Sequence, residues 1–109
     1  MQELISKILS FRDARDWKQF HTPENLAKSI SIEAGEILEH FQWDNQFDAH
    51  QVSEELADVF IYLVLMADSI DVDLKEVVLN KISKNESRYT IEKAKGNSTK
   101  YTELNGNDQ

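Results

Sequence analysis

The stretch EELADVFIYLVLMA, residues 54–67, decides the fold. Its second half, VFIYLVLMA, is apolar on every side of a helix, yet nine residues are too few to cross a bilayer. We therefore expect a helix over about residues 50–70 whose second half is buried all round. The first half of the stretch places Glu55 and Asp58 three residues apart, on one face of that helix.

Helical periodicity continues on both sides of this stretch. Apolar spacing predicts a first helix over about residues 2–14. The run Thr22-Pro23-Glu24 is typical of an N-cap, a first-turn proline and an acidic first turn, and it begins a helix over about residues 23–41. A last helix is expected over about residues 74–93. With no strand-period segment long enough for a sheet, the sequence predicts an all-α four-helix bundle.

Domain organisation follows from the same pattern. We expect one helical domain over residues 1–94 and a polar, flexible tail over residues 95–109. Three neighbouring helices cannot easily cover a helix that is apolar all round. A second chain covering the remaining face is the simpler interpretation, so we predict a homo-oligomer.

Composition excludes several classes of function. Twenty acidic against 12 basic residues give a net charge of −8, which argues against binding to a nucleic-acid polymer or an anionic membrane. The chain has no cysteine, and therefore no disulfide, thiolate zinc site or cysteine nucleophile; this fits a cytoplasmic location. The N-terminal residues lack the apolar core of a signal peptide.

Carboxylates interrupt an otherwise apolar helix strip in SISIEAGEILEHFQW, residues 29–43. Glu33 and Glu36 are neighbours there, as Glu55 and Asp58 are on the later helix. If the two helices pack side by side, four carboxylates converge, and each pair at about 4 Å repels by roughly 4 kcal/mol. A cation would relieve this repulsion, and hard oxygen ligands favour Mg²⁺ or Mn²⁺.

Alternatives to this metal site remain open on spacing alone. Acidic pairs of this kind are common on solvated faces, and the two interpretations are equally balanced here. A ferritin-like di-iron bundle needs Glu-x-x-His on two helices, and none of the three histidines has it. His40 follows Glu36 by four residues, and we expect it to be a partly exposed residue at a helix end, at most supporting the ligands.

The motifs and their surroundings resemble the MazG-like family of all-α nucleotide pyrophosphohydrolases, most closely its dCTP pyrophosphatase branch. The family's ExxE motif is found at 33–36 and its ExxD motif at 55–58, with an 18-residue spacer. More specific segments resemble that branch in the same order: RDWKQFHTPENLAKSISIEAGEILEHFQW, EELADVFIYLVLMADSIDVDL, KISKNESRY and KYTEL. The resemblance covers roughly residues 12–104.

This resemblance implies an activity. Enzymes of this kind cleave a (deoxy)nucleoside triphosphate between the α and β phosphates, giving monophosphate and pyrophosphate; dCTP is the expected substrate and nucleotide-pool cleansing the expected role. Glu33, Glu36, Glu55 and Asp58 would hold Mg²⁺, with Mn²⁺ as a substitute. Glu33 or Glu36 would orient or deprotonate the attacking water.

The resemblance also implies which residues hold the nucleotide's phosphates. Lys81, Asn85 and Arg88 follow one another at i, i+4 and i+7, on one face of the last helix. A cation and an amide on that face suit the β and γ phosphates. Apart from this resemblance, the alternative interpretation of Lys81 is a solvated surface lysine.

A base pocket is implied at four further positions. They are Trp17, Trp43 and Tyr62, with His21 as a weaker candidate. The alternative is that the tryptophans belong to the core. One departure concerns Ile8, which occupies a position where the family's first helix can carry a histidine near the base. The base preference therefore stays open.

Several functions remain as alternatives. Within the class, dUTP or another noncanonical triphosphate could be the substrate. Outside it, the chain could be a non-catalytic nucleotide- or metal-sensing protein, or a purely structural helical oligomer. The family favours assembly as a dimer or, with greater weight, a dimer of dimers, with helices packed between chains.

Overall fold

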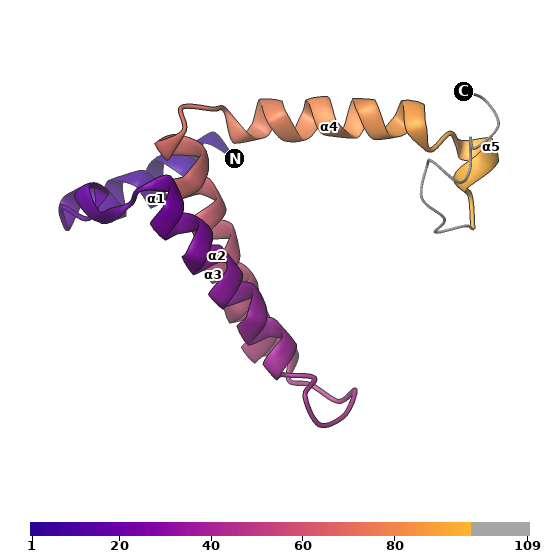
Figure 1. Cartoon of the computed structure of the whole chain (residues 1–109), viewed down its shortest axis with the longest axis horizontal. Coiled ribbons are helices and arrows are strands. Elements are labelled where there is room, and N and C mark those ends of the chain that lie inside the picture. Colours follow the sequence, from indigo (N-terminus) through magenta and orange to yellow (C-terminus); the bar gives the residue numbers. More distant parts are fainter. Residues whose placement is uncertain (97–109) are drawn as a thin grey trace. The chain divides into compact units, whose positions relative to one another are not determined.

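The computed structural model describes residues 1–96 and contains only helices in that range (Figure 1). The elements are α1 (Gln2–Ala14), the 3₁₀ turn η1 (Lys18–Phe20), α2 (Pro23–Glu39), α3 (Ala49–Ser69), α4 (Leu74–Arg88) and α5 (Ile91–Ala94). The predicted all-α class is confirmed. None of these helices combines the length and apolarity that a bilayer crossing requires. From residue 97 onward, the predicted flexible tail lies outside the described residues.

Helix α1 has the predicted bounds and ends in a Schellman motif. Asp16 adopts a left-handed conformation with φ of 54°, and its N–H donates to the Asp13 carbonyl at 3.0 Å. The next N–H, from Trp17, reaches back to the Arg12 carbonyl at 3.2 Å. The Trp17 ring then meets the Phe11 ring edge-on, with centroids 5.7 Å apart. The helix end therefore determines where Trp17 lies.

Helix α2 begins as its capping signal predicts. The Thr22 hydroxyl accepts from the Asn25 N–H at 3.2 Å, and Pro23 occupies the first helical position. Leu26, one turn later, is buried. The helix ends at Glu39, two residues before the expected end, and a short turn follows.

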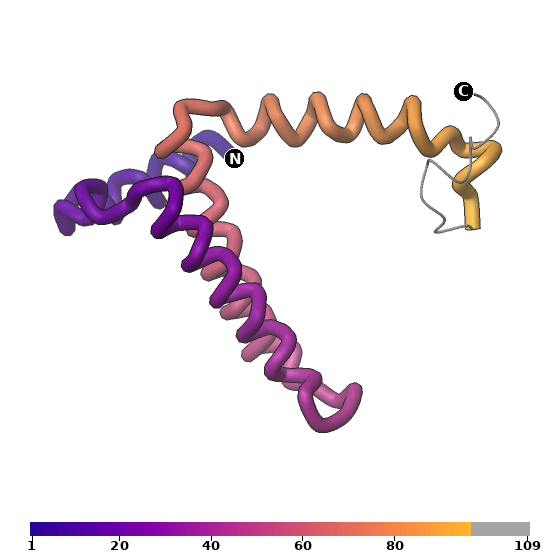
Figure 2. The backbone as a smooth tube through the Cα atoms, viewed as in Figure 1, coloured from indigo at the N-terminus to yellow at the C-terminus, as the bar shows by residue number. Residues whose placement is uncertain are grey.

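Helices α2 and α3 form an antiparallel hairpin, joined by a loop over residues 40–48 (Figure 2). The carboxylate of Asp48 caps α3 by accepting from the N–H groups of His50 and Gln51, at 2.9 and 3.2 Å. Helix α1 packs on α3 as well. The hairpin places the ExxE segment of α2 beside the ExxD segment of α3.

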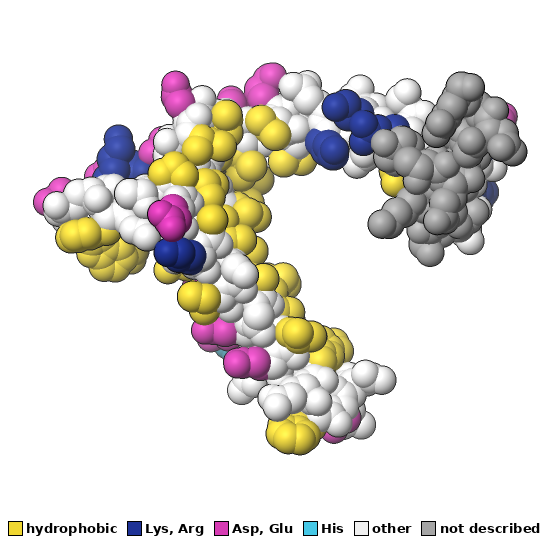
Figure 3. Space-filling model, in the orientation of Figure 1, with side chains coloured by type: hydrophobic (Ala, Val, Ile, Leu, Met, Phe, Trp, Pro, Cys, Tyr) yellow, Lys and Arg dark blue, Asp and Glu magenta, His cyan; other side chains and the backbone are white. Residues whose placement is uncertain are grey.

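The apolar run 59–67 is only partly covered within this chain. Val64, Leu65 and Ala67 are buried, but Ile61 and Leu63 are 36% and 39% exposed. Burial on every side is thus not reached within the single chain, because α1 and α2 cover only part of the α3 surface. Figure 3 shows hydrophobic side chains left at the surface along the hairpin. This open face is the one for which a second chain was predicted.

The chain divides into two compact units, Met1–Asp73 and a second unit beginning at Leu74. In the second unit, α4 ends at Arg88 rather than near residue 93, because Thr90 adopts an extended conformation and begins the short helix α5. Thr90 occupies the N-cap position of α5, where threonine is among the favoured residues. No residue of α4 is buried.

Candidate active site

Three carboxylates converge between α2 and α3. Glu33 extends from α2, and Glu55 and Asp58 extend from α3; one oxygen from each lies within 4.8 Å of the others. The spacing of each motif puts its residues on the inner face of its helix, and the antiparallel hairpin brings the two faces together. The structure therefore joins three of the four predicted metal ligands.

Glu36 interacts electrostatically with Glu33 and Glu55. Burial raises the pKa of Glu33 to about 7, together with a hydrogen bond to Glu36 and repulsion from the charges of Glu36, Asp58 and Glu55. The pKa of Glu55 is raised first by its hydrogen bond to Glu36 and then by burial. We refer to Glu33, Glu36, Glu55 and Asp58 as the carboxylate cluster. It resists full ionisation, as the sequence argument required.

His40 lies beside this cluster. Its Nε2 is 3.7 Å from Oε1 of Glu55, and both side chains are about one-fifth exposed. The backbone N–H of His40 caps the end of α2, and a hydrogen bond from its side chain partly offsets the rise in the pKa of Glu55. The structure thus places His40 where it can support a ligand, in addition to its expected place at a helix end.

Two oxygens of the cluster have no partner among the residues described. Glu33 Oε2 and Glu55 Oε2 are buried and accept no hydrogen bond. A buried polar atom without a partner is costly, and more so on a carboxylate. A hard divalent cation such as Mg²⁺ would satisfy both oxygens, because it prefers carboxylate ligands. The residues present therefore fit such an ion.

A cavity of about 240 Å³ adjoins the cluster between α1, α3 and the residues that flank η1. Trp17, His21 and Tyr62 line it, and so does Asp58 of the cluster. Three of the four predicted base contacts thus share one cavity, and a predicted metal ligand forms part of its wall. Ile8 also lines it, at the position where a histidine was considered. We call this space the base cavity.

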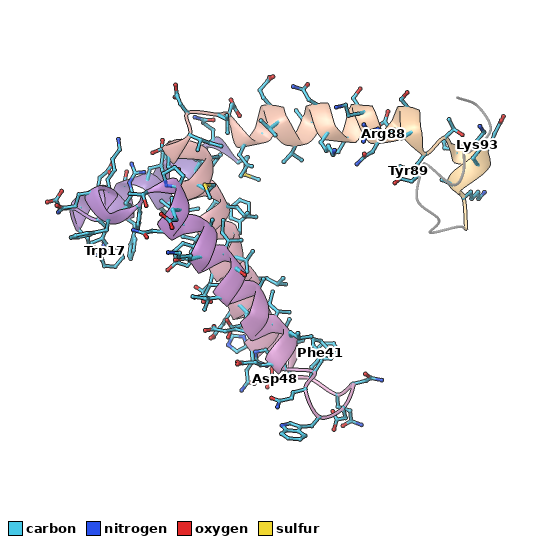
Figure 4. The ribbon with its side chains drawn as sticks, viewed as in Figure 1. Trp17, Phe41, Asp48, Arg88, Tyr89 and Lys93 are labelled. Atoms are coloured by element: carbon cyan, nitrogen blue, oxygen red, sulfur yellow. The ribbon has the colours of Figure 1, made fainter. Side chains whose placement is uncertain are left out.

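Trp43 is not part of the base cavity. It lies in the loop between α2 and α3 and is 87% exposed. Trp17, which follows α1 (Figure 4), is 45% exposed. Within this chain neither tryptophan is a core residue, so the alternative of a purely structural role in the core is wrong for both. A role for Trp43 in holding the base stays a prediction.

Arg12 is a residue of the site that the sequence did not single out. It is only 5% exposed, and its Nη1 donates to Oδ2 of Asp68 at 2.6 Å, while its Nε donates to Oδ1 of Asp13 at 2.9 Å. It lines the base cavity. The sequence held one signal for this: Arg12 follows Ile8 by four residues and so lies on the apolar strip of the first helix, where a buried arginine can be suspected.

His21 stands next to this arginine. Its Nδ1 is buried and finds no hydrogen-bond partner in the described part of the chain. Burial lowers the pKa of His21, and the charge of Arg12 lowers it further, so the imidazole is neutral near pH 7. The wall of the base cavity therefore includes a neutral imidazole, with one buried and unpartnered nitrogen, beside a buried cation.

The predicted phosphate contacts lie on α4, in the second unit. Lys81 is exposed, whereas Asn85 and Arg88 are half-buried; Figure 4 labels Arg88 near the end of the helix. Helix α4 is continuous over all three, so they share one face as the spacing requires. Their contact with phosphate stays a prediction.

Comparison with known proteins finds relatives that share one name. The chain is 38% identical over 104 residues to dCTP pyrophosphatase 1 of Mus musculus, covering 86% of this chain and 61% of that protein. It is 41% identical over 104 residues to dCTP pyrophosphatase 1 of Homo sapiens, with the same coverage of 86% and 61%. The chain thus spans about three fifths of the length of the curated relatives it matches.

A solved structure and a family model extend this result. The crystal structure of a pyrophosphatase from Archaeoglobus fulgidus is similar with a TM-score of 0.70 and 42% identity, over 83% of this chain and 92% of that one. The model of the MazG-like family matches residues 28–104, which include both carboxylate motifs. The chain therefore belongs to the MazG-like family.

Proposed function

We propose that this chain is a nucleoside triphosphate pyrophosphohydrolase, which splits a deoxynucleotide, dCTP above all, into monophosphate and pyrophosphate. The observation that carries the proposal is the carboxylate cluster, whose unpartnered oxygens adjoin a base-sized cavity through Asp58. The names of the mouse and human relatives, dCTP pyrophosphatase 1, support the substrate. Nucleotide-pool cleansing in the cytoplasm is the corresponding role.

The cluster would supply the chemistry of the reaction. Mg²⁺, or Mn²⁺ in its place, would be held by Glu33, Glu36, Glu55 and Asp58, where it would neutralise phosphate charge and acidify water. Glu33 or Glu36 would orient the attacking water and accept its proton. The place of Glu33 within the cluster suits this role, because a general base must lie within hydrogen-bond reach of the water it activates. The reaction requires no covalent nucleophile.

Other residues would hold the substrate. The rings of Trp17 and Tyr62 offer flat faces to a base, and stacking on such faces is worth about 1–3 kcal/mol. His21 would contact the edge of the base, and Trp43 would cover it. Lys81, Asn85 and Arg88 would bind the β and γ phosphates through charge-assisted hydrogen bonds.

Assembly is the second part of the proposal. Large apolar side chains are exposed on the hairpin, among them Ile32, Leu38 and Leu56. Such a surface is unusual for a monomer and typical of an interface. We propose a homo-oligomer, a dimer or a dimer of dimers, in which helices from different chains complete a four-helix bundle.

The decisive test is hydrolysis of a triphosphate panel with Mg²⁺, with products separated by ion-exchange chromatography. We expect monophosphate and pyrophosphate, with dCTP turned over fastest. Glu36→Gln and Asp58→Asn should each lower kcat at least about a hundredfold, since several kcal/mol of charge stabilisation depends on the intact cluster. Glu54→Gln is the matched control, because Glu54 is exposed and pairs with His50 instead.

Other outcomes would select other functions. Stepwise release of orthophosphate would make the chain a different phosphohydrolase, and a ranking led by dUTP would change the substrate. Binding of metal and nucleotide without turnover would indicate a sensing protein. Glu36→Gln that stabilises the fold and alters nothing else would indicate a structural oligomer.

A further inference from the structure

The two carboxylate oxygens of Glu55 have different surroundings. Oε1 lies 3.7 Å from Nε2 of His40, whereas Oε2 is buried and has no hydrogen-bond partner among the described residues. Oε2 of Glu33, from the facing helix, is buried and unpartnered as well. The two oxygens that a cation would satisfy are therefore distinct from the oxygen that lies beside the imidazole.

His40 reaches Glu55 because of where α2 ends. It is the C-cap residue of that helix, one turn after the ExxE motif, and its backbone keeps a helical conformation with φ of −64° and ψ of −17°. Its N–H donates to the Ile37 carbonyl at 3.2 Å. The backbone that carries the imidazole is thus fixed by the helix end, and the ring is only about one-fifth exposed.

Within residues 1–73, no other basic side chain forms an ion pair with the carboxylate cluster. The other ion pairs of this unit join Arg12 to Asp13 and Asp68, Lys28 to Glu24, and His50 to Glu54. An imidazole can donate from Nε2 in its protonated form and in one neutral tautomer, so the contact with Glu55 does not depend on a full charge. His40 is therefore the side chain of this unit that can orient a glutamate of the cluster.

We propose that His40 is a positioning residue for the cation: its Nε2–H holds Oε1 of Glu55, and Oε2 is left to bind the ion. Glutamate is among the side chains with the most rotamer freedom to lose, so an unheld Glu55 would bind the ion less tightly. Groups that hydrogen-bond a ligating carboxylate typically account for about ten- to a hundredfold in metal affinity. The inference rests on the proposed function and deepens it, because it makes retention of the ion depend on a residue outside both carboxylate motifs.

The test measures the affinity for Mn²⁺ alone, by titration calorimetry, in His40→Leu and in the matched control His50→Leu. Both remove an imidazole from a glutamate, but the pair of His50 and Glu54, 3.0 Å apart, is exposed and lies outside the cluster. We expect His40→Leu to weaken Mn²⁺ binding by about ten- to a hundredfold and His50→Leu to leave it unchanged. His40→Gln should recover part of the loss, because its amide N–H can donate in place of Nε2–H.

Two further measurements separate the orientation of Glu55 from other roles of His40. In a Glu55→Gln background, His40→Leu should cause little further loss of Mn²⁺ affinity, because no carboxylate remains for the imidazole to orient. Electron spin echo spectroscopy of Mn²⁺ bound to the wild-type protein needs no variant and therefore does not depend on the folding of His40→Leu. It should show no directly coordinated nitrogen, since a positioning residue contacts the ligand and not the ion.

Four results would overturn the inference: unchanged Mn²⁺ affinity in His40→Leu, equal losses in His40→Leu and His50→Leu, a full additional loss in the Glu55→Gln background, or a nitrogen bound directly to Mn²⁺. Each of them leaves the hydrolase proposal intact if the wild-type protein turns over dCTP. Absence of turnover in the wild-type protein, with Mn²⁺ affinity still lost in His40→Leu and kept in His50→Leu, would overturn the hydrolase proposal and support the role of His40.

Discussion

At the scale of single residues, the Glu33 carboxyl makes the stability of the metal-free chain depend on pH. Its pKa is about 7 in the folded state, against an ordinary value of 4.5. Between these values the folded chain holds a proton that the unfolded chain has released. The stabilisation is therefore fully present below about pH 4.5 and is lost as the pH rises through about 7.

We predict that Glu33→Gln removes this pH dependence. Thermal unfolding with a chelator present should show the wild-type midpoint falling from about pH 5 to about pH 8, and the variant should show a flatter curve. His21 acts in the opposite sense, because its lowered pKa adds stability as the pH rises toward 6.5. Glu39→Gln, an exposed site on the same helix, is the control. A variant as steep as the wild type would contradict the assignment to Glu33.

Single residues also show where prediction from sequence ends. The four acidic positions could be predicted from sequence, because their spacing on two helices implies convergence once those helices pack side by side. The role of Arg12 could not be predicted, because it depends on Asp68, which lies 56 positions away along the chain. No local pattern predicts which carboxylate will meet a given arginine.

At the scale of helices, α1 and α3 end in the same way. Asp16 and Asp71 both adopt left-handed conformations, with φ of 54° and 59°. Each is followed by an N–H that reaches back to a carbonyl five residues earlier, from Trp17 to Arg12 and from Val72 to Ala67. Glycine is the residue that adopts this conformation without steric cost.

Substitution at Asp71 should separate backbone strain from side-chain effects. Asp71→Gly should raise the free energy of unfolding by about 0.5–1 kcal/mol, because it relieves the left-handed strain. Asp71→Ala removes the same carboxylate but keeps the Cβ, so it should be less stable than the glycine variant by about 1 kcal/mol. Urea denaturation measures both values. An alanine variant as stable as the glycine variant would show that the backbone there carries no strain.

Helix boundaries were predictable where a local signal marks them. Thr22 and Pro23 marked the start of α2, and the cap formed as expected. The end of α4 was not marked in this way, because apolar spacing continued past Arg88 and only the extended conformation of Thr90 shows the break. A threonine within a helical pattern is too common to predict a break.

At the scale of the whole molecule, the uncovered apolar surfaces predict association. Helix α4 buries none of its residues, although Leu74, Val78 and Ile82 follow one strip along it. A 15-residue helix gains little stability on its own, so this strip needs a packing partner. The proposed oligomer provides a partner for such a strip.

We predict that the native protein in solution has a mass that is a multiple of the 12.6 kDa of one chain. We also predict that Ile82→Asn weakens this assembly. Ile82 is 48% exposed on the apolar strip, and an amide there removes the apolar area that association would bury. Ser83→Asn places the same side chain one position off the strip and should leave the mass unchanged. Light scattering coupled to gel filtration gives the masses. A monomeric wild-type protein would refute the oligomer.

Asp58 is a member of both the carboxylate cluster and the wall of the base cavity, and this double membership has a thermodynamic consequence. Two ligands that share one side chain cannot bind independently. If the base changes the affinity of the cluster for a cation by some factor, the cation changes the affinity for the base by the same factor, because the coupling free energy is reciprocal. The affinity for the base and the affinity for the cation are then coupled in this chain. A substitution that changes one of these affinities will also change the other.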